Sequence, residues 1–161
     1  MRGQNEMKFP EFAKKSFSLV ELIILAAILG IMAAVVVPFF QSQSTQAKEA
    51  VARDHLRILR SAVELYTVQH RGIPPGYEGD NPINTPSNTV FLTQMLDSGD
   101  YLKKMPVNPF NSKDNIRMVG NSESFPESPV EGYGWIYQPA TMTIRLSWSG
   151  TDSDGIRYFD Y

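Results

Sequence analysis

The sequence contains no cysteine, which excludes disulfide bonds, thiolate metal ligands and a cysteine nucleophile. Histidine is scarce as well, because the chain has only His55 and His70. We expect both on helix surfaces, since two imidazoles leave little material for a zinc centre. An excess of positive charge is also lacking, as the formal net charge is −2. Binding to nucleic acid requires clustered lysine and arginine, so this balance argues against a nucleic-acid partner.

Many of the apolar residues are concentrated in one run. The rest of the 161 residues is enough for one modest domain. Leu22–Phe40 contains no charged residue. As a helix rising about 1.5 Å per residue it would span roughly 28 Å, close to the hydrocarbon thickness of a bilayer. The run is longer than the apolar core of a cleaved secretory signal and has no Ala-X-Ala after it, so we expect it to stay in the membrane. Lysines 14 and 15 precede it, which predicts a cytoplasmic N-terminus.

An ionisable residue, Glu21, stands at the start of this run, where a carboxylate is costly unless it is paired. Cleavage between Ser16 and Phe17 would create an α-amine one helical turn before Glu21. That amine could neutralise Glu21 of a neighbouring copy, so the charge would be satisfied only in an assembly. The alternative is an ordinary signal-anchor in which the glutamate is incidental.

The stretch KSFSLVE, followed by the long apolar run, resembles the class III signal of type IV pilins and type II secretion pseudopilins. The resemblance implies that a prepilin peptidase cuts between Ser16 and Phe17 and methylates the new amine of Phe17. The residue before the cut is usually Gly in this family, and here it is Ser16. The resemblance also implies that Glu21 guides each subunit into a helical filament.

The same resemblance divides the chain into a cleaved cytoplasmic leader (1–16), a transmembrane and polymerisation helix (17–40) and a periplasmic globular domain (41–161). Gly30 and Pro38 stand where such pilins carry a Gly and a Pro that weaken the helix. Physically, Gly lowers helix propensity and Pro removes a backbone donor, so the helix could bend when packed in a filament.

Downstream of Pro38 the sequence has the periodicity of an amphipathic helix, which Gly72, Pro74 and Pro75 should end near Arg71. This helix would continue the membrane helix and bury one apolar stripe. The residues expected on that stripe are Ala47, Val51, Ile58, Ala62 and Leu65, with Leu59, Val63 and Tyr66 beside them.

The rest of the chain predicts a small α+β domain. Pro, Gly and Asn mark residues 72–88 as a loop, and a short helix is expected at Val90–Leu96. Alternation predicts two strands, Gly134–Gln138 and Thr143–Ser147, joined through Pro139 and Ala140. The expected fold is therefore pilin-like: a long N-terminal helix, with a transmembrane half and an amphipathic half, packed on a small C-terminal antiparallel β-sheet. The aromatic residues of this region suit its core, or alternatively a stacking platform for carbohydrate or bases: Tyr133, Trp135, Tyr137 and Trp148.

The stretch SGTDSDG places Asp152 and Asp154 in a short loop flanked by glycines. Alternating carboxylates in such a loop can supply the oxygen ligands that Ca²⁺ prefers. The resemblance to major pseudopilins implies a calcium site made by Asp152, then Asp154, with the carbonyl of Ser149 as a further candidate. The alternative is an Asp-rich turn stabilised by side-chain to backbone hydrogen bonds.

The sequence has no Ser/His/Asp grouping and no phosphate-binding glycine motif, so we expect no enzyme. The resemblance implies a structural subunit of a type II secretion pseudopilus, a helical homo-oligomer that drives protein export across the outer membrane. It would be a single-pass protein of the bacterial inner membrane. Its implied partners are the prepilin peptidase, the minor pseudopilins and an inner-membrane assembly platform with its ATPase. Two alternatives are a type IV pilus subunit for adhesion, motility or DNA uptake, and a monomeric signal-anchored periplasmic binding module.

Overall fold

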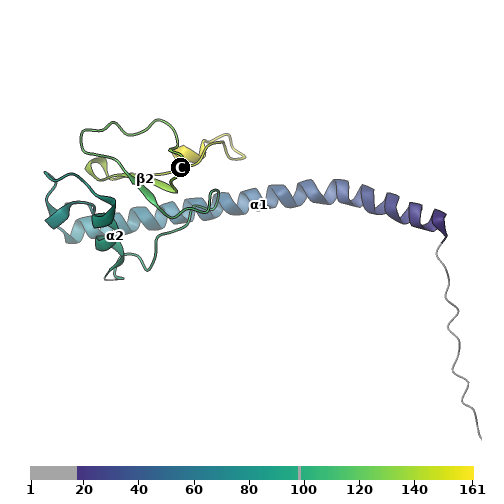
Figure 1. The fold of residues 1–161 in the computed structure, drawn as a ribbon, viewed down its shortest axis with the longest axis horizontal. Coiled ribbons are helices and arrows are strands. Elements are labelled where there is room, and N and C mark those ends of the chain that lie inside the picture. The colour runs from purple at the N-terminus through teal and green to yellow at the C-terminus, as the bar shows by residue number, and fades with distance from the viewer. Residues whose placement is uncertain (1–17, 98) are drawn as a thin grey trace, which may run out of the picture. The chain divides into compact units, whose positions relative to one another are not determined.

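The computed structural model describes residues 18–97 and 99–161, and of residues 37–42 it describes the backbone only. The chain divides into two units, Met1–Gln41 and Ser42–Tyr161. Its longest element is helix α1, Leu19–Gln69. A short helix and three short strands follow in the second unit (Figure 1).

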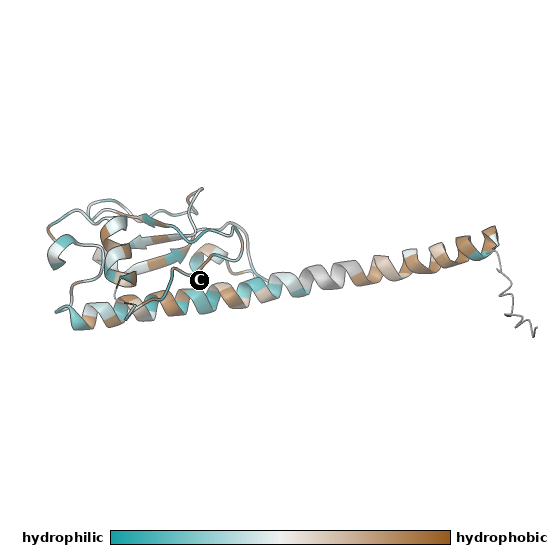
Figure 2. Cartoon of the chain, turned by 60° about the horizontal axis from the view of Figure 1, so that its bottom comes forward, coloured by the Kyte–Doolittle hydropathy of each residue, from teal (hydrophilic) through white to brown (hydrophobic). Residues whose placement is uncertain are grey.

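The upstream part of α1 is predominantly apolar (Figure 2). Leu19–Val36 has a mean hydropathy of 2.8, and none of it is buried. Within the described residues, this is the one segment whose length and composition suit a membrane span. The segment is consistent with the expected single-pass anchor.

Helix α1 ends close to the expected position. Arg71 and Gly72 have φ angles of 58° and 84°, in the left-handed region that ends helices. The Gly72 amide donates to the Thr67 carbonyl at 2.8 Å, which satisfies one of the last helical carbonyls. Glycine adopts this conformation without steric cost, so Gly72 explains the end of the helix.

The buried face of α1 differs from the expected stripe. Val51, Ile58 and Leu65 are 41%, 40% and 46% exposed, and Ala47 is exposed as well, so the prediction was wrong for these residues. The prediction holds for Ala62. The core instead takes the neighbouring stripe, spaced by four and three residues: Ala52, Leu56, Leu59, Val63 and Tyr66. Both stripes have helical spacing, and the sheet and α2 cover only the second.

Helix α2, Asn88–Leu96, confirms the short helix and begins two residues before the expected start. Its buried residues, Phe91 and Met95, join the core of α1. The Phe91 ring lies 5.1 Å from that of Tyr137 in the sheet. Helix α2 thus closes one side of the core.

The sheet has the order β1-β2-β3, with strands Ile116–Met118, Trp135–Gln138 and Thr143–Leu146. The two expected strands are confirmed as β2 and β3, which pair antiparallel with Trp135 opposite Leu146. Strand β1 was not expected, and it pairs parallel to β2. The sheet is therefore mixed, which corrects the expectation of a purely antiparallel sheet. The three residues of β1 are too few to show alternation in the sequence.

A close backbone approach fixes the entry into β2. A Cβ atom at Gly134 would lie 2.3 Å from the Lys113 carbonyl oxygen, so no other residue fits without movement. Asn108, which is fully buried, donates from its amide to the Gly134 carbonyl at 3.0 Å. The loop before β1 is thus held against the strand by hydrogen bonds rather than by a regular element.

Candidate functional site

The sequence points to two candidate sites, one at the head of α1 and one in the loop after β3. At the first, Ser18 precedes the helix and its Oγ accepts a hydrogen bond from the Val20 amide at 3.3 Å. Ser18 is therefore the N-cap, and Glu21 is the third helical residue. This is the Ser-X-X-Glu pattern of a capping box, and a carboxylate in the first turn is also favoured by the helix dipole. The sequence analysis did not consider this pattern, although within the described residues the Glu21 carboxylate makes no hydrogen bond back to Ser18.

The structure does not bring the other residues predicted for assembly together. Ser16 and Phe17 lie outside the described residues. Gly30 is an interior residue of α1, and a Cβ atom added there would meet nothing within 4 Å. Pro38 lies within the bounds of α1, eight residues further on.

The second candidate site is the terminal loop, which we define as residues 149–161. Asp152 organises it through Oδ1, which accepts the Asp154 amide at 2.9 Å and the Ile156 amide at 2.8 Å. The Asp152 amide in turn donates to the Ile156 carbonyl at 2.9 Å. These bonds form the side-chain-stabilised turn that the sequence analysis gave as its alternative to calcium binding.

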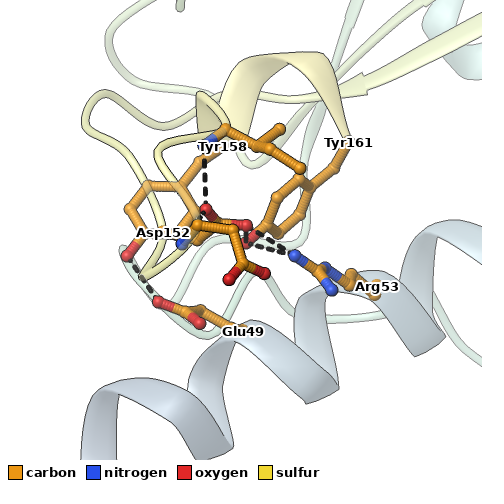
Figure 3. A network of polar contacts seen from close by, with 7 residues as sticks. Glu49, Arg53, Asp152, Tyr158 and Tyr161 are labelled. Atoms are coloured by element: carbon orange, nitrogen blue, oxygen red, sulfur yellow. Dashed lines mark hydrogen bonds and ion pairs between the residues drawn. The ribbon is translucent and has the colours of Figure 1, made fainter. Parts of the chain in front are cut away.

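The other carboxylate oxygen of Asp152 connects the loop to helix α1 (Figure 3). Oδ2 lies 2.5 Å from Nη2 of Arg53 and accepts the Tyr161 hydroxyl at 2.9 Å. The Asp152 side chain is fully buried, whereas that of Arg53 is 51% exposed. The guanidinium carbon of Arg53 also lies 4.4 Å from the centroid of the Tyr161 ring.

Another pair joins the same two elements one helical turn earlier. Tyr158 donates its hydroxyl proton to Oε1 of Glu49 at 2.9 Å, and both residues are buried (Figure 3). Burial and this bond to a carboxylate raise the pKa of Tyr158 to about 12. We call Glu49, Arg53, Asp152, Tyr158 and Tyr161 the loop network.

Burial alone would raise the pKa of the Asp152 carboxyl. The Ile156 amide, the Tyr161 hydroxyl and the charge of Arg53 outweigh this effect and hold the pKa below its ordinary value. Asp152 is therefore an ionised, buried group with four donors around two oxygens. A third residue of α1, Arg60, adds to the attachment by donating to the main-chain oxygens of Ile144 and Tyr161.

The loop network does not fit a calcium site as it is arranged. Calcium takes six to eight oxygen ligands, and both oxygens of Asp152 are already committed to protein donors. Asp154 is exposed and lines one hollow with Arg53 and Tyr161, but its carboxylate makes no hydrogen bond or ion pair with the described residues. Within residues 18–97 and 99–161, no three His, Cys, Asp or Glu side chains gather as metal ligands would.

Arg53, Glu49, Tyr158 and Tyr161 were missed from the sequence. The sequence analysis considered only the apolar residues of this part of the helix. Glu49 and Arg53 are spaced by four residues, which places them on one edge of the buried stripe. This spacing was the available signal, but only the fold brings Asp152 to it.

The aromatic residues belong mainly to the core. Trp135 and Tyr137 are fully buried, which leaves neither free to stack on a ligand. Trp148 is 36% exposed and stacks on Phe110, with 5.9 Å between ring centroids. Two of the four aromatic side chains thus lie in the core, whereas the half-buried Tyr133 lines one surface hollow with Trp148.

Known proteins similar to this chain were found by sequence. The type II secretion system core protein G of Pseudomonas aeruginosa is 31% identical over 113 residues, which cover 70% of this chain and 79% of that protein. The chain belongs to the family of the type II secretion system core protein G. The resemblance to pseudopilins is thereby confirmed, and so is the pilin-like α+β fold class.

Two further relatives bear on this assignment, one a core protein G and one a type IV pilus component. The core protein G of Aeromonas hydrophila is 27% identical over 100 residues, 62% of this chain and 69% of that protein. The type IV narrow pilus major component PilA5 of Thermus thermophilus is 42% identical over 60 residues, 37% of this chain and 52% of that protein. None of these three relatives is named as an enzyme. No family model and no solved structure matches the chain.

Proposed function

We propose that the chain is a structural subunit of a type II secretion pseudopilus, a helical filament that drives protein export across the outer membrane. The observation that carries this proposal is that a chain of this family has a helical segment, Leu19–Val36, long and apolar enough to cross a membrane. The segment exposes apolar side chains on every face, with a single carboxylate, Glu21, in its first turn. Packing of such helices against each other covers the apolar surface and leaves the carboxylate in need of a positive partner.

That partner would be the N-terminus of a neighbouring subunit. The prepilin peptidase would remove residues 1–16 and methylate the amine of Phe17, which stands one helical turn before Glu21. Gly30 and Pro38 would let the helix bend in the filament. We expect residues 41–161 on the periplasmic side of the inner membrane and the N-terminus in the cytoplasm.

The proposed subunit performs no catalysis. The energy for lengthening the filament would come from the ATPase of an inner-membrane assembly platform, and minor pseudopilins would be its other partners. The part of the chain that the structure describes supports this passive role, since its buried charged groups serve to hold the terminal loop.

The capping-box position of Glu21 makes a sharp test possible. Glu21→Gln keeps the shape and the hydrogen-bonding capacity of a capping box but removes the charge. If Glu21 pairs with a neighbour's amine, Glu21→Gln and Glu21→Ala should both insert in the membrane and form no filaments, as seen by shearing and electron microscopy. Glu21→Asp, which keeps the charge, should assemble in part. Normal filaments from Glu21→Gln would overturn the charge pairing.

Processing is tested by the mass of the N-terminal peptide of protein purified from its native membrane. A peptide that begins with N-methylated Phe17 is the expected result. A peptide that retains residues 1–16 would indicate a plain signal-anchor. Without cleavage there would be no α-amine at Phe17 to neutralise Glu21 of a neighbouring subunit.

A second candidate is a type IV pilus subunit, which the similarity to the Thermus pilus component favours. Deletion of the gene separates the two. Loss of exported proteins from the medium with normal surface pili, motility and DNA uptake is expected for the secretion subunit. The converse pattern would assign the chain to a pilus.

A further inference from the structure

We propose that the guanidinium of Arg53 is the cation of the terminal loop, so that this loop folds onto helix α1 without a divalent metal ion. The proposal concerns the second unit of the chain and does not depend on filament assembly. Three features of the described residues carry it: the burial of Asp152, the saturation of its oxygens, and the origin of Arg53 in a different element.

Asp152 needs a positive partner. Its side chain is fully buried, and a buried carboxylate persists only when it is paired and hydrogen-bonded. Within the loop, the amides of Asp154 and Ile156 donate to Oδ1 and the Tyr161 hydroxyl donates to Oδ2, but none of these three donors is charged. The net negative charge of the carboxylate therefore has to be balanced from outside the turn.

Arg53 provides this balance at Oδ2. Its Nη2 lies 2.5 Å from that oxygen, and the Tyr161 hydroxyl at 2.9 Å completes the shell. A metal ion bound to Oδ2 would have to displace both donors and would then lie beside a fixed positive charge. It would also find few further carboxylates. Asp154 is exposed and lines one hollow with Arg53 and Tyr161, but within residues 18–97 and 99–161 no three His, Cys, Asp or Glu side chains gather as metal ligands would.

The origin of Arg53 gives the ion pair a structural role that a metal within the loop would not have. Arg53 belongs to α1, ninety-nine residues before Asp152 in the sequence. It is one of three attachments of the loop to α1, together with the Glu49–Tyr158 bond one turn away and the bond from Arg60 to the main-chain oxygen of Tyr161. The cation therefore docks the loop on the helix as well as neutralising it.

The test is a set of melting curves of the full chain in detergent micelles, followed by near-ultraviolet circular dichroism. The natural chain should have the same Tm in about 5 mM calcium as in EGTA, a concentration above the Kd of weak extracellular sites. A site filled at about a hundred times its Kd would instead raise Tm by roughly 5–10 °C. Such a rise, or calcium binding by calorimetry, would overturn the proposal whatever the variants do.

The variant Arg53→Gln addresses the role of the guanidinium directly. It should lower Tm in EGTA by about 2–4 °C and make the terminal loop sensitive to limited proteolysis. The matched control is Arg57→Gln, one turn further along α1, whose exposed guanidinium pairs with Asp54 at 2.7 Å on the surface. It should leave both measurements unchanged.

Arg53→Lys covers the case in which Arg53→Gln does not fold. Lysine keeps the charge and loses the planar fork, so we expect it to fold, with a Tm between those of the natural chain and Arg53→Gln. Equal protease resistance of the loop in Arg53→Lys, Arg53→Gln and the natural chain would overturn the role of Arg53.

Discussion

Leu25 and Leu59 lie on the same helix and differ entirely in surroundings: Leu25 is 46% exposed, and Leu59 is completely buried. The carboxylates of the two regions differ in the same way. Glu49 accepts the Tyr158 hydroxyl within the chain, whereas the Glu21 carboxylate makes no hydrogen bond or ion pair with the residues that the structure describes. The downstream half of α1 thus finds its partners in its own chain, and the upstream half has surface and charge left for a membrane and other subunits.

The largest expected effect comes from opening a cavity in the downstream half. Leu59→Ala should lower the free energy of unfolding by about 2–5 kcal/mol, because the removed methyl groups leave a space that the core fills only in part. Leu25→Ala is the matched control and should leave the unfolding of the second unit unchanged. The measurement is urea unfolding of the full chain in detergent, followed by near-ultraviolet circular dichroism. Equal losses in both variants would contradict the distinction between the two halves.

The second largest effect is expected from Glu49, whose replacement should lower the unfolding free energy, whereas replacement of Glu21 should not. Glu49→Ala leaves the buried Tyr158 hydroxyl without its acceptor, which should cost about 1–3 kcal/mol of unfolding free energy. Glu21→Ala should cost nothing in the same assay, although we expect it to abolish filaments. The double variant Glu49→Ala/Tyr158→Phe removes donor and acceptor together and should recover part of the loss. No recovery would mean that Glu49 acts through other contacts.

Alkaline pH should weaken the loop network. The pKa of Tyr158 in the folded chain is about 12, above its ordinary value of 10.0, so the folded state holds this proton more tightly. The stabilisation is complete below pH 10 and is lost as the pH rises toward 12. Tyr158→Phe removes this group and should flatten the fall of Tm over that range. An unchanged slope would show that other tyrosines dominate the alkaline transition.

The smallest expected effect is the loss of stability at low pH when Asp152 is protonated. The pKa of Asp152 in the folded chain lies below its ordinary value of 3.8, so its contribution is present above that pH and is lost as the pH falls through the lower, folded value. The half-exposed Arg53 limits the size of this contribution, because water screens the ion pair. Asp152→Asn should reduce the acid sensitivity of Tm, and Asp154→Asn, on the exposed side of the turn, should not. A larger effect from Asp154→Asn than from Asp152→Asn would mean that Asp154, and not Asp152, is the carboxylate whose charge stabilises the loop.

Local patterns in the sequence determined much of this protein. The uncharged run, the end of α1 at Gly72, helix α2, and strands β2 and β3 were all predicted, because each depends on residues that are near each other in the chain. The motif around Glu21 indicated the pseudopilin family, which the comparison with the Pseudomonas protein then confirmed.

Only the tertiary structure decided which of two neighbouring stripes of α1 is buried. Val51 and Leu56 belong to different stripes of helical spacing, and the sheet and α2 cover only the one that contains Leu56. The parallel pairing of β1 and the attachment of Asp152 to Arg53 were also beyond the sequence. The reason is the same in each case: these contacts join residues far apart in the chain, and their energy depends on burial that exists only once the fold has formed.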